Sequence, residues 1–267
     1  DTGTDGAHLA FRGTVASGFN PAFPSGGNFD TDIHGTAVAG IIHQIAPVAV
    51  IVPINTLGFG FTVNDLWKSV KYVADHPFVD DPRTPGIDES VDNPLTPEDD
   101  RVRVVAANMS LGIRIPTDPD NALDSEQDAF VTDQSTVLAL KSVFAKYRQL
   151  GIVPFASACN EGQLFNGLSG SIIPAIFNEV VEVIASYPWG PAPPLAGPPL
   201  AFDIDAGVLT VTDRCVLEAG DEIAFPGKIA AFSNRNVTSD FAAPGTCVAT
   251  YAPSLYTANI TGVDQAV

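Results

Sequence analysis

Two kinds of apolar run alternate along this chain, and that alternation is the feature that most limits its fold. Runs typical of buried strands cover 48–54, 102–107, 152–156 and 180–185. Runs with helical spacing cover 34–46, 63–74 and 135–150. Strands that are apolar on both faces belong in a parallel sheet, because helices then shield each face from water. The pattern predicts an α/β fold with a mostly parallel sheet and helices on both faces.

The segment 135–150 gives the clearest helix prediction. Its apolar residues recur at intervals that predict one buried face. The residues expected on that face are Val137, Leu138, Leu140, Val143, Phe144 and Tyr147. The segment 63–74 has the same kind of spacing. The segment 34–46 ends before Pro47, which stops a helix.

Length and charge limit the class of protein. The 267 residues suit one large α/β domain or two small ones, and we expect a single domain over 1–267. The formal net charge is −18, from 13 basic and 31 acidic residues. Such a charge repels nucleic-acid phosphates and anionic membrane surfaces, so neither is an expected partner. No run approaches the roughly 20 apolar residues of a membrane helix, and we expect a secreted or extracytoplasmic protein.

Two segments interrupt the alternation and are predicted to be insertions. Segment 75–100 carries nine acidic residues, one basic residue and five prolines. It is expected to be a solvated loop, with a weak calcium site as the alternative. Segment 188–200 is rich in Pro, Gly and Ala, and 201–224 alternates as in a β-hairpin or a small subdomain. Together they predict a β-rich insertion over about 188–228.

The cysteines exclude a disulfide scaffold, because three are too few to build one. Cys215 and Cys247 could form one disulfide, whereas Cys159 lies in a different part of the chain. No group of Cys and His residues has the spacing of a zinc site. The sequence therefore predicts no metal site of this type.

Four short segments carry residues of the kind that acyl transfer needs. They are Asp1-Thr2-Gly3, His34 to Gly40, Asn108 to Gly112 and Ala158 to Gly162. Acyl transfer by a serine uses a nucleophile, a base, a group that orients the base, and donors for the oxyanion. In a parallel sheet, residues at the carboxyl ends of neighbouring strands meet, which is where open α/β proteins place their sites.

In this order the four segments resemble the aspartate, histidine, substrate-binding and oxyanion segments of subtilisin-like serine proteases, the subtilases. The resemblance implies a subtilisin-like three-layer fold and a serine endopeptidase that hydrolyses peptide bonds. It implies that Asp1 orients His34, that His34 is the general base, and that Asn160 donates to the oxyanion. The substrate-binding residues that it implies are Ser110, Leu111, Gly112, Ala158, Cys159 and Glu161. The expected partners are a protein or peptide substrate and a pro-segment.

The chain departs from the subtilase pattern in its nucleophile and beside the oxyanion asparagine. No Gly-Thr-Ser followed by a small-residue helix occurs in the 267 residues, so the serine is expected just beyond Val267. The domain is accordingly expected to be incomplete at both ends. Gly245-Thr246-Cys247 follows the Ala-Pro of a structural turn, so Cys247 is expected to begin a strand and not to act as the nucleophile. Cys159 stands where the family usually has glycine, which could narrow the pocket.

Two functions stay open at this point. One is the protease, and the alternative is a non-catalytic peptide-binding module on a subtilase scaffold that has lost its serine. The presence of Asp1, His34 and Asn160 favours the protease. No cofactor is expected to be required. Many subtilases carry a calcium loop after the histidine motif, but here the chain passes straight to Pro47, so calcium is expected only as a structural ion at an unknown site.

Overall fold

The computed structural model of the chain describes residues 1–11, 13–23, 30, 32–57, 61–83, 101–114, 134–160, 164–165, 172–186, 229–230, 233–236, 239–244 and 250. Several predictions lie outside these residues. They concern Glu161, Cys215, Cys247, the 188–228 insertion and the part of the acidic segment after Arg83.

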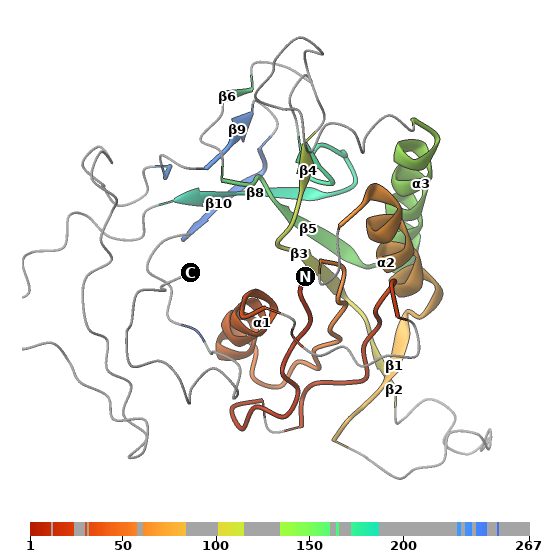
Figure 1. Ribbon diagram of the computed structural model, residues 1–267, viewed down its shortest axis with the longest axis vertical. Helices are drawn as coiled ribbons and strands as arrows, with labels where there is room; N and C mark the ends of the chain where they lie inside the picture. The colour runs from red at the N-terminus through yellow and green to blue at the C-terminus, as the bar shows by residue number, and fades with distance from the viewer. Residues whose placement is uncertain are drawn as a thin grey trace, which may run out of the picture.

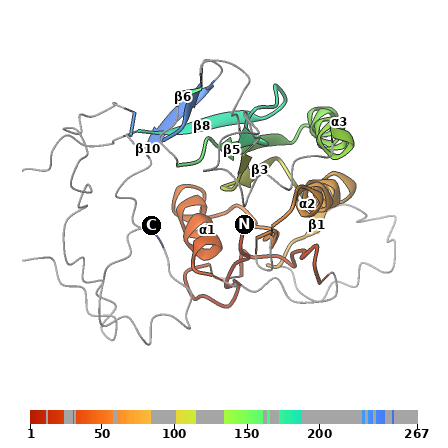
Figure 2. The same cartoon turned by 45° about the horizontal axis from the view of Figure 1, so that its top comes forward.

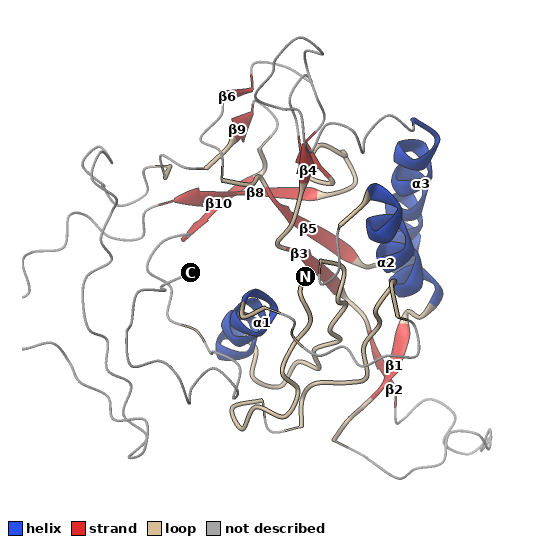
Figure 3. Ribbon diagram, in the orientation of Figure 1, coloured by secondary structure: helices blue, strands red, loops and turns tan. Residues whose placement is uncertain are grey.

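A four-stranded parallel sheet is the centre of the described structure (Figure 1, Figure 3). Its strands are β3 (Ala106–Met109), β5 (Val153–Ser157), β8 (Val181–Ser186) and β10 (Phe241–Pro244), in the order β10-β8-β5-β3. The register pairs Asn108 with Phe155, and Phe155 with Val181. Every pairing in this sheet is parallel, so the strands end at the same edge. The expected α/β fold with a mostly parallel sheet is confirmed.

In the part of the chain that the structure describes, three helices accompany the sheet, each within one residue of its predicted bounds. They are α1 (His34–Ile45), α2 (Val63–Asp75) and α3 (Gln134–Leu150). The side chain of Thr62 caps α2 by accepting a hydrogen bond from the Asp65 N–H at 3.2 Å. Helices α2 and α3 lie side by side, whereas α1 stands apart from them with the first residue of the chain in between (Figure 1, Figure 2).

The core lies where α2 and α3 pack together and α3 meets β5. Leu66 and Val70 of α2 are buried against Leu140, Phe144 and Tyr147 of α3. Their three- and four-residue spacing places each set on one face of its helix. The Tyr147 hydroxyl donates to the Val70 carbonyl oxygen at 2.9 Å, which ties the two helices by a buried hydrogen bond.

Leu138 is a correction to the predicted face of α3. Its side chain is 67% exposed. A helix turns by about 100° per residue, so Leu138 lies about 200° from Leu140 and faces the other way. The buried face of α3 is therefore narrower than predicted, because not every apolar residue of the segment lies on it.

The apolar run 48–54 does not form the continuous strand that its composition predicts. It pairs with residues 15–19 through two isolated parallel bridges, Val15 with Ile51 and Phe19 with Ile54. Between the bridges stands Pro53, whose carbonyl accepts from the Phe19 N–H at 3.1 Å. Proline has no N–H to donate, so it interrupts the ladder between the two bridges.

Short pairings complete the described strands. They are β1 (Phe78–Asp80) with β2 (Arg101–Arg103), antiparallel; β4 (Ile113–Arg114) with β7 (Ile172–Ile173), antiparallel; and β6 (Leu164–Phe165) with β9 (Arg235–Asn236), parallel. The predicted strand 102–107 is therefore divided between β2 and β3. The segment 75–100, predicted to be a solvated loop, contains a strand near its start. This strand is β1, which pairs with β2 directly after the segment.

None of the helices in the described residues is both long enough and apolar enough to span a membrane.

Candidate active site

Asp1 and His34 form a hydrogen-bonded pair at the first turn of α1. His34 Nδ1 lies 2.8 Å from Asp1 Oδ1. An ionised carboxylate can only accept, so Nδ1 carries the proton and Nε2 is left as an acceptor. The structure thus brings together the two residues that the sequence singled out as base and orienting group.

Backbone hydrogen bonds fix Asp1 from the side opposite α1. The N-terminal amine donates to the Ile54 carbonyl oxygen at 3.2 Å. The Asp1 carbonyl oxygen accepts from the N–H groups of Thr56 at 2.7 Å and Leu57 at 3.0 Å. The carboxylate is therefore carried by a backbone that is tied to the end of the 48–54 run.

Gly35 allows the first residues of the chain to press directly on α1. A Cβ at Gly35 would overlap the Gly3 carbonyl oxygen and lie 2.9 Å from its carbonyl carbon. Gly3 itself has φ 106°, in the region that favours glycine. The Gly35 N–H donates to the Thr2 hydroxyl at 2.8 Å. Two glycines thus permit the approach that brings Asp1 to His34.

Asp30 is a residue of this region that the sequence reasoning missed. Its carboxylate accepts from the Thr2 hydroxyl at 2.6 Å and from the Thr36 backbone N–H at 2.8 Å. It therefore satisfies one of the free N–H groups at the start of α1. An aspartate shortly before a predicted helix is a capping signal, and the Asp30-Thr31-Asp32 run before His34 contains it.

The pKa of the His34 imidazole is held below its ordinary value. The chief cause is burial, and the nearby N-terminal amine lowers it further, while Asp32 and Asp30 act in the opposite direction. Burial also lowers the pKa of the N-terminal amine, to about 5. Near neutral pH the imidazole is therefore the neutral form that a general base requires.

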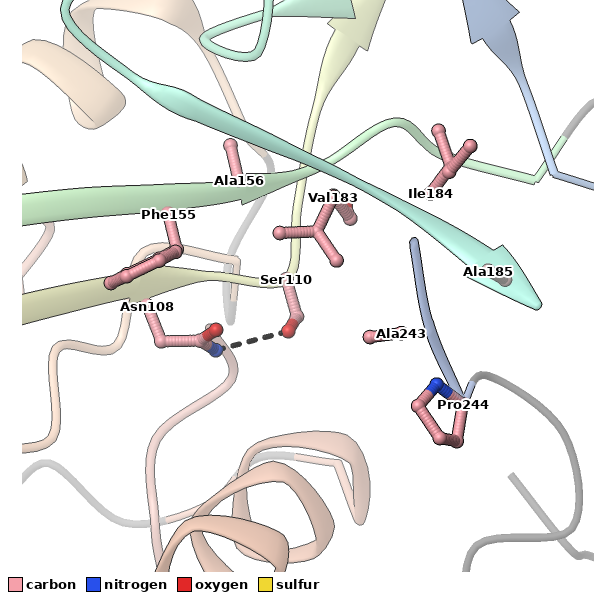
Figure 4. Close-up of a pocket in the computed structure, with 10 residues that line it drawn as sticks. Asn108, Ser110, Phe155, Ala156, Val183, Ile184, Ala185, Ala243 and Pro244 are labelled. Carbon is pink, nitrogen blue, oxygen red and sulfur yellow. Dashed lines mark hydrogen bonds between the residues drawn. The ribbon is translucent and has the colours of Figure 1, made fainter. Parts of the chain in front are cut away.

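Ser110 follows β3 and lies in a pocket at the carboxyl ends of the strands (Figure 4). The Asn108 side-chain amide donates to the Ser110 hydroxyl at 3.0 Å. The pocket has a volume of about 280 Å³ and is bounded further on by Val183 and Pro244. Polar groups of β3 thus face apolar residues of β8 and β10 across this hollow.

Leu111 and Gly112 occupy a different environment from Ser110. The Leu111 side chain is buried in the core. A Cβ at Gly112 would overlap the Ile172 side chain and lie 2.5 Å from the Cys159 sulfur. Of the three residues expected to bind substrate here, Ser110 alone lines the pocket described above.

The segment after β5 carries the expected oxyanion residues. Ala158 is buried, and its N–H donates to the Val183 carbonyl oxygen at 3.0 Å. Cys159 is a half-buried cysteine with φ 65°, which is a conformation that glycine adopts without strain. The Asn160 side chain is exposed. The backbone angle gives a physical reason for the glycine that is usual in subtilases at the position of Cys159.

A larger cavity is lined by residues of both groups. Its volume is about 620 Å³, and its lining includes Asp1, Gly35, Asn108 and Leu111. Asp1, which is hydrogen-bonded to His34, and the end of β3 before Ser110 thus line the same cavity.

The residues that the structure describes contain no group of three His, Cys, Asp or Glu side chains placed to hold a metal ion. Calcium as a structural ion stays a prediction, since most of the acidic segment lies outside the described residues.

Solved structures similar to this chain include proteases. A lanthipeptide protease has a TM-score of 0.56 at 18% identity, over 94% of this chain and 56% of that one. A cold adapted subtilisin-like serine proteinase has a TM-score of 0.52 at 19% identity, over 92% and 60%. The nisin leader peptidase NisP from Lactococcus lactis has a TM-score of 0.53 at 16% identity, over 91% and 60%. These likenesses show the fold, and the chain spans less than two thirds of each of the three proteins.

Comparison with curated proteins gives no match. The sequence model of the subtilase family, Peptidase S8, matches residues 1–266. The match includes the aspartate, histidine, strand-end and asparagine segments that were described above. The chain therefore belongs to the subtilase family.

Proposed function

We propose that this chain is part of a serine endopeptidase that hydrolyses peptide bonds. The observation that carries the proposal is the 2.8 Å hydrogen bond between His34 Nδ1 and Asp1 Oδ1 in a chain of the subtilase family. In this arrangement Asp1 fixes the tautomer and orientation of the imidazole. His34 Nε2 then accepts the proton of the attacking hydroxyl and returns it to the leaving amine.

The nucleophile of the proposed reaction is a serine from sequence outside residues 1–267, which hold no Gly-Thr-Ser segment. One contact supports a place for it near His34. The Thr250 hydroxyl donates to the Ala37 carbonyl oxygen, which lies within the first turn of α1. The chain that follows β10 therefore returns to the helix that carries the base.

Asn160 is proposed to donate its side-chain amide to the oxyanion. Exposure of that side chain supports the role, because an oxyanion donor has to reach the substrate and not the protein core. Loss of one such donor lowers turnover by about 100- to 1000-fold. Cys159 and Glu161 are proposed to contact the substrate beside it, whereas Ala158 is buried and its N–H is bonded to the Val183 carbonyl oxygen.

The proposed substrate is a protein or peptide in extended conformation. Ser110 supports this because it continues a strand and lines an open pocket. Leu111 and Gly112 would contribute through their backbone, since the Leu111 side chain is in the core and Gly112 has none. The net charge of −18 supports a secreted or extracytoplasmic setting.

The test is labelling of the full-length natural protein with a fluorophosphonate probe. An activated serine attacks phosphorus, fluoride leaves, and the hydroxyl proton passes to the base. We expect labelling of the wild type and its loss in His34→Ala, because removal of the base from such a triad lowers turnover by roughly a millionfold. His76→Ala is the matched control, since His76 is an exposed histidine at the end of α2.

Two results would contradict the protease function. Equal labelling of wild type and His34→Ala would exclude His34 as the base. Absence of labelling, together with binding of extended peptides at micromolar concentration, would favour the non-catalytic peptide-binding module.

A further inference from the structure

Asp30 joins the two segments that carry Asp1 and His34. Its Oδ1 accepts a hydrogen bond from the Thr2 hydroxyl at 2.6 Å. Its Oδ2 accepts from the Thr36 backbone N–H at 2.8 Å and also from the Thr36 hydroxyl. Thr2 directly follows Asp1, and Thr36 lies two residues after His34. One carboxylate thus binds both segments at once.

The link closes into a ring through Thr2. The hydroxyl that donates to Asp30 accepts from the Gly35 N–H at 2.8 Å. Thr2 and Thr36 are both buried, so water competes little for these hydrogen bonds. Movement of Thr2 away from α1 would break its bond to Asp30 and its bond to Gly35 together.

We propose that Asp30 is a positioning residue that holds the Asp1 carboxylate in register with the His34 imidazole. It acts through Thr2 on one side and through the first turn of α1 on the other. Its importance for catalysis rests on the proposed function, whereas its effect on the Asp1–His34 pair does not.

The number of donors explains why this position needs a carboxylate. Asp30 accepts from the Thr2 hydroxyl, the Thr36 N–H, the Thr36 hydroxyl and, at 3.2 Å, the Asp32 N–H. An ionised carboxylate offers about four lone-pair sites and no donor, whereas an amide offers one acceptor oxygen. Its negative charge also lies at the positive end of the helix dipole. Asparagine would therefore leave donors in this cluster unpaired.

The charged groups around His34 allow positioning to be separated from charge. The carboxylates of Asp1, Asp30 and Asp32 carry this charge, whereas the N-terminal amine, whose pKa burial lowers to about 5, is mostly neutral near neutral pH. Asp32 is exposed, and its carboxylate accepts from the neighbouring Ile33 N–H at 2.6 Å. Asp32→Asn thus removes a nearby negative charge without removing an acceptor from the Asp30 cluster, which makes it the matched control.

The test is solvent exchange of the His34 Nδ1 proton, followed by nitrogen-15 NMR on the full-length protein. We compare the wild type with Asp30→Asn, Thr2→Val and Asp32→Asn. Loss of one hydrogen bond to a charged group corresponds to about a ten- to hundredfold change in an equilibrium. We expect exchange to accelerate by about that factor in Asp30→Asn and Thr2→Val. Asp32→Asn should exchange at the wild-type rate.

Two outcomes would overturn the proposal. One is wild-type exchange in both Asp30→Asn and Thr2→Val. The other is equal acceleration in Asp32→Asn, which would assign the effect to charge. If Asp30→Asn does not fold, wild-type exchange in Thr2→Val would by itself overturn the proposal, because that variant removes the bond between Thr2 and Asp30 and keeps the bond from Thr36 to Asp30. A full-length protein that resists the fluorophosphonate probe but keeps a slowly exchanging Nδ1 proton would contradict the protease function alone.

Discussion

Replacing Gly35 by alanine tests whether close approach of two backbones holds the candidate site together. Helix propensity alone predicts that the variant is more stable, because alanine favours a helix over glycine by about 1 kcal/mol. The structure predicts the opposite sign. The added Cβ would overlap the carbonyl oxygen of Gly3, and the carbonyl carbon and the nitrogen of Gly3 lie only 2.9 and 3.0 Å from it. These are backbone atoms, so no side-chain rotation can relieve the clash.

The expected magnitude follows from what the clash displaces. Overpacking of a buried contact costs about 1–3 kcal/mol. Separation of the segments would also break the Gly35–Thr2 hydrogen bond, and the bond between Asp1 and His34, at about 1 kcal/mol or more each. After subtraction of the helix term, we expect Gly35→Ala to lower the free energy of unfolding by about 2–4 kcal/mol.

Urea denaturation gives the stability, and the His34 Nδ1 proton reports the pair in the same sample. Gly6→Ala is the matched control, because its closest new contact is a side-chain methyl of Val15 at 3.3 Å. That variant should stay within about 0.5 kcal/mol of wild type. A Gly35→Ala protein that is as stable as wild type, with its Nδ1 proton still protected, would refute the close-approach argument.

Three further predictions concern a buried bond and two titrating groups. Tyr147→Phe removes the hydroxyl that donates to Val70, so the unfolding free energy in urea should fall by about 1 kcal/mol; an unchanged value would mean that the bond contributes nothing. Because burial holds the pKa of His34 below 6.5, fluorophosphonate labelling should decline at acid pH with a midpoint below pH 6.5, and a midpoint above 6.5 would contradict His34 as the base. Protonation of His34 is less favourable in the folded state than in the unfolded state, so this group also lowers the free energy of unfolding as pH falls below 6.5. Burial raises the pKa of Glu182, so its contribution to stability is full below about pH 4.5 and is lost as pH rises through the folded pKa. In urea denaturation, Glu182→Gln should therefore be as stable as wild type at pH 4 and more stable than wild type at pH 8. Equal stability of the two proteins at both pH values would contradict a raised pKa at Glu182.

The helices and the central sheet could be predicted from the sequence because their burial is periodic. Segments 34–46, 63–74 and 135–150 became helices, and 152–156 and 180–185 lie in parallel strands. Two local errors have physical causes. Pro53 lacks the N–H that a continuous strand would use, and Leu138 is apolar but lies on the solvent side of α3. Composition alone cannot distinguish an apolar residue that faces solvent from one that faces the core.

The candidate site shows a different limit of sequence reasoning. Asp1 and His34 could be paired from their segments, and the structure places them in hydrogen-bond contact. Leu111 could not be assigned in the same way, since its segment suits both a substrate contact and the core. The structure places its side chain in the buried core cluster that also contains Ile113 and Ile173. Motif position fixes where the backbone passes, but tertiary packing fixes where each side chain points.

Asp30 illustrates why a residue that supports a site is harder to find than a residue within it. Its value as a cap is visible in the sequence, because aspartate before a helix start is a common signal. Its second bond, to Thr2, joins residues 28 positions apart and depends on glycine at position 35. That bond forms only when the first residues of the chain lie against α1, so it cannot be predicted from a local sequence pattern. The bond between Thr2 and Asp30 and the bond between Asp1 and His34 both depend on the close approach of the first residues to α1. A substitution that prevents this approach should therefore break both bonds.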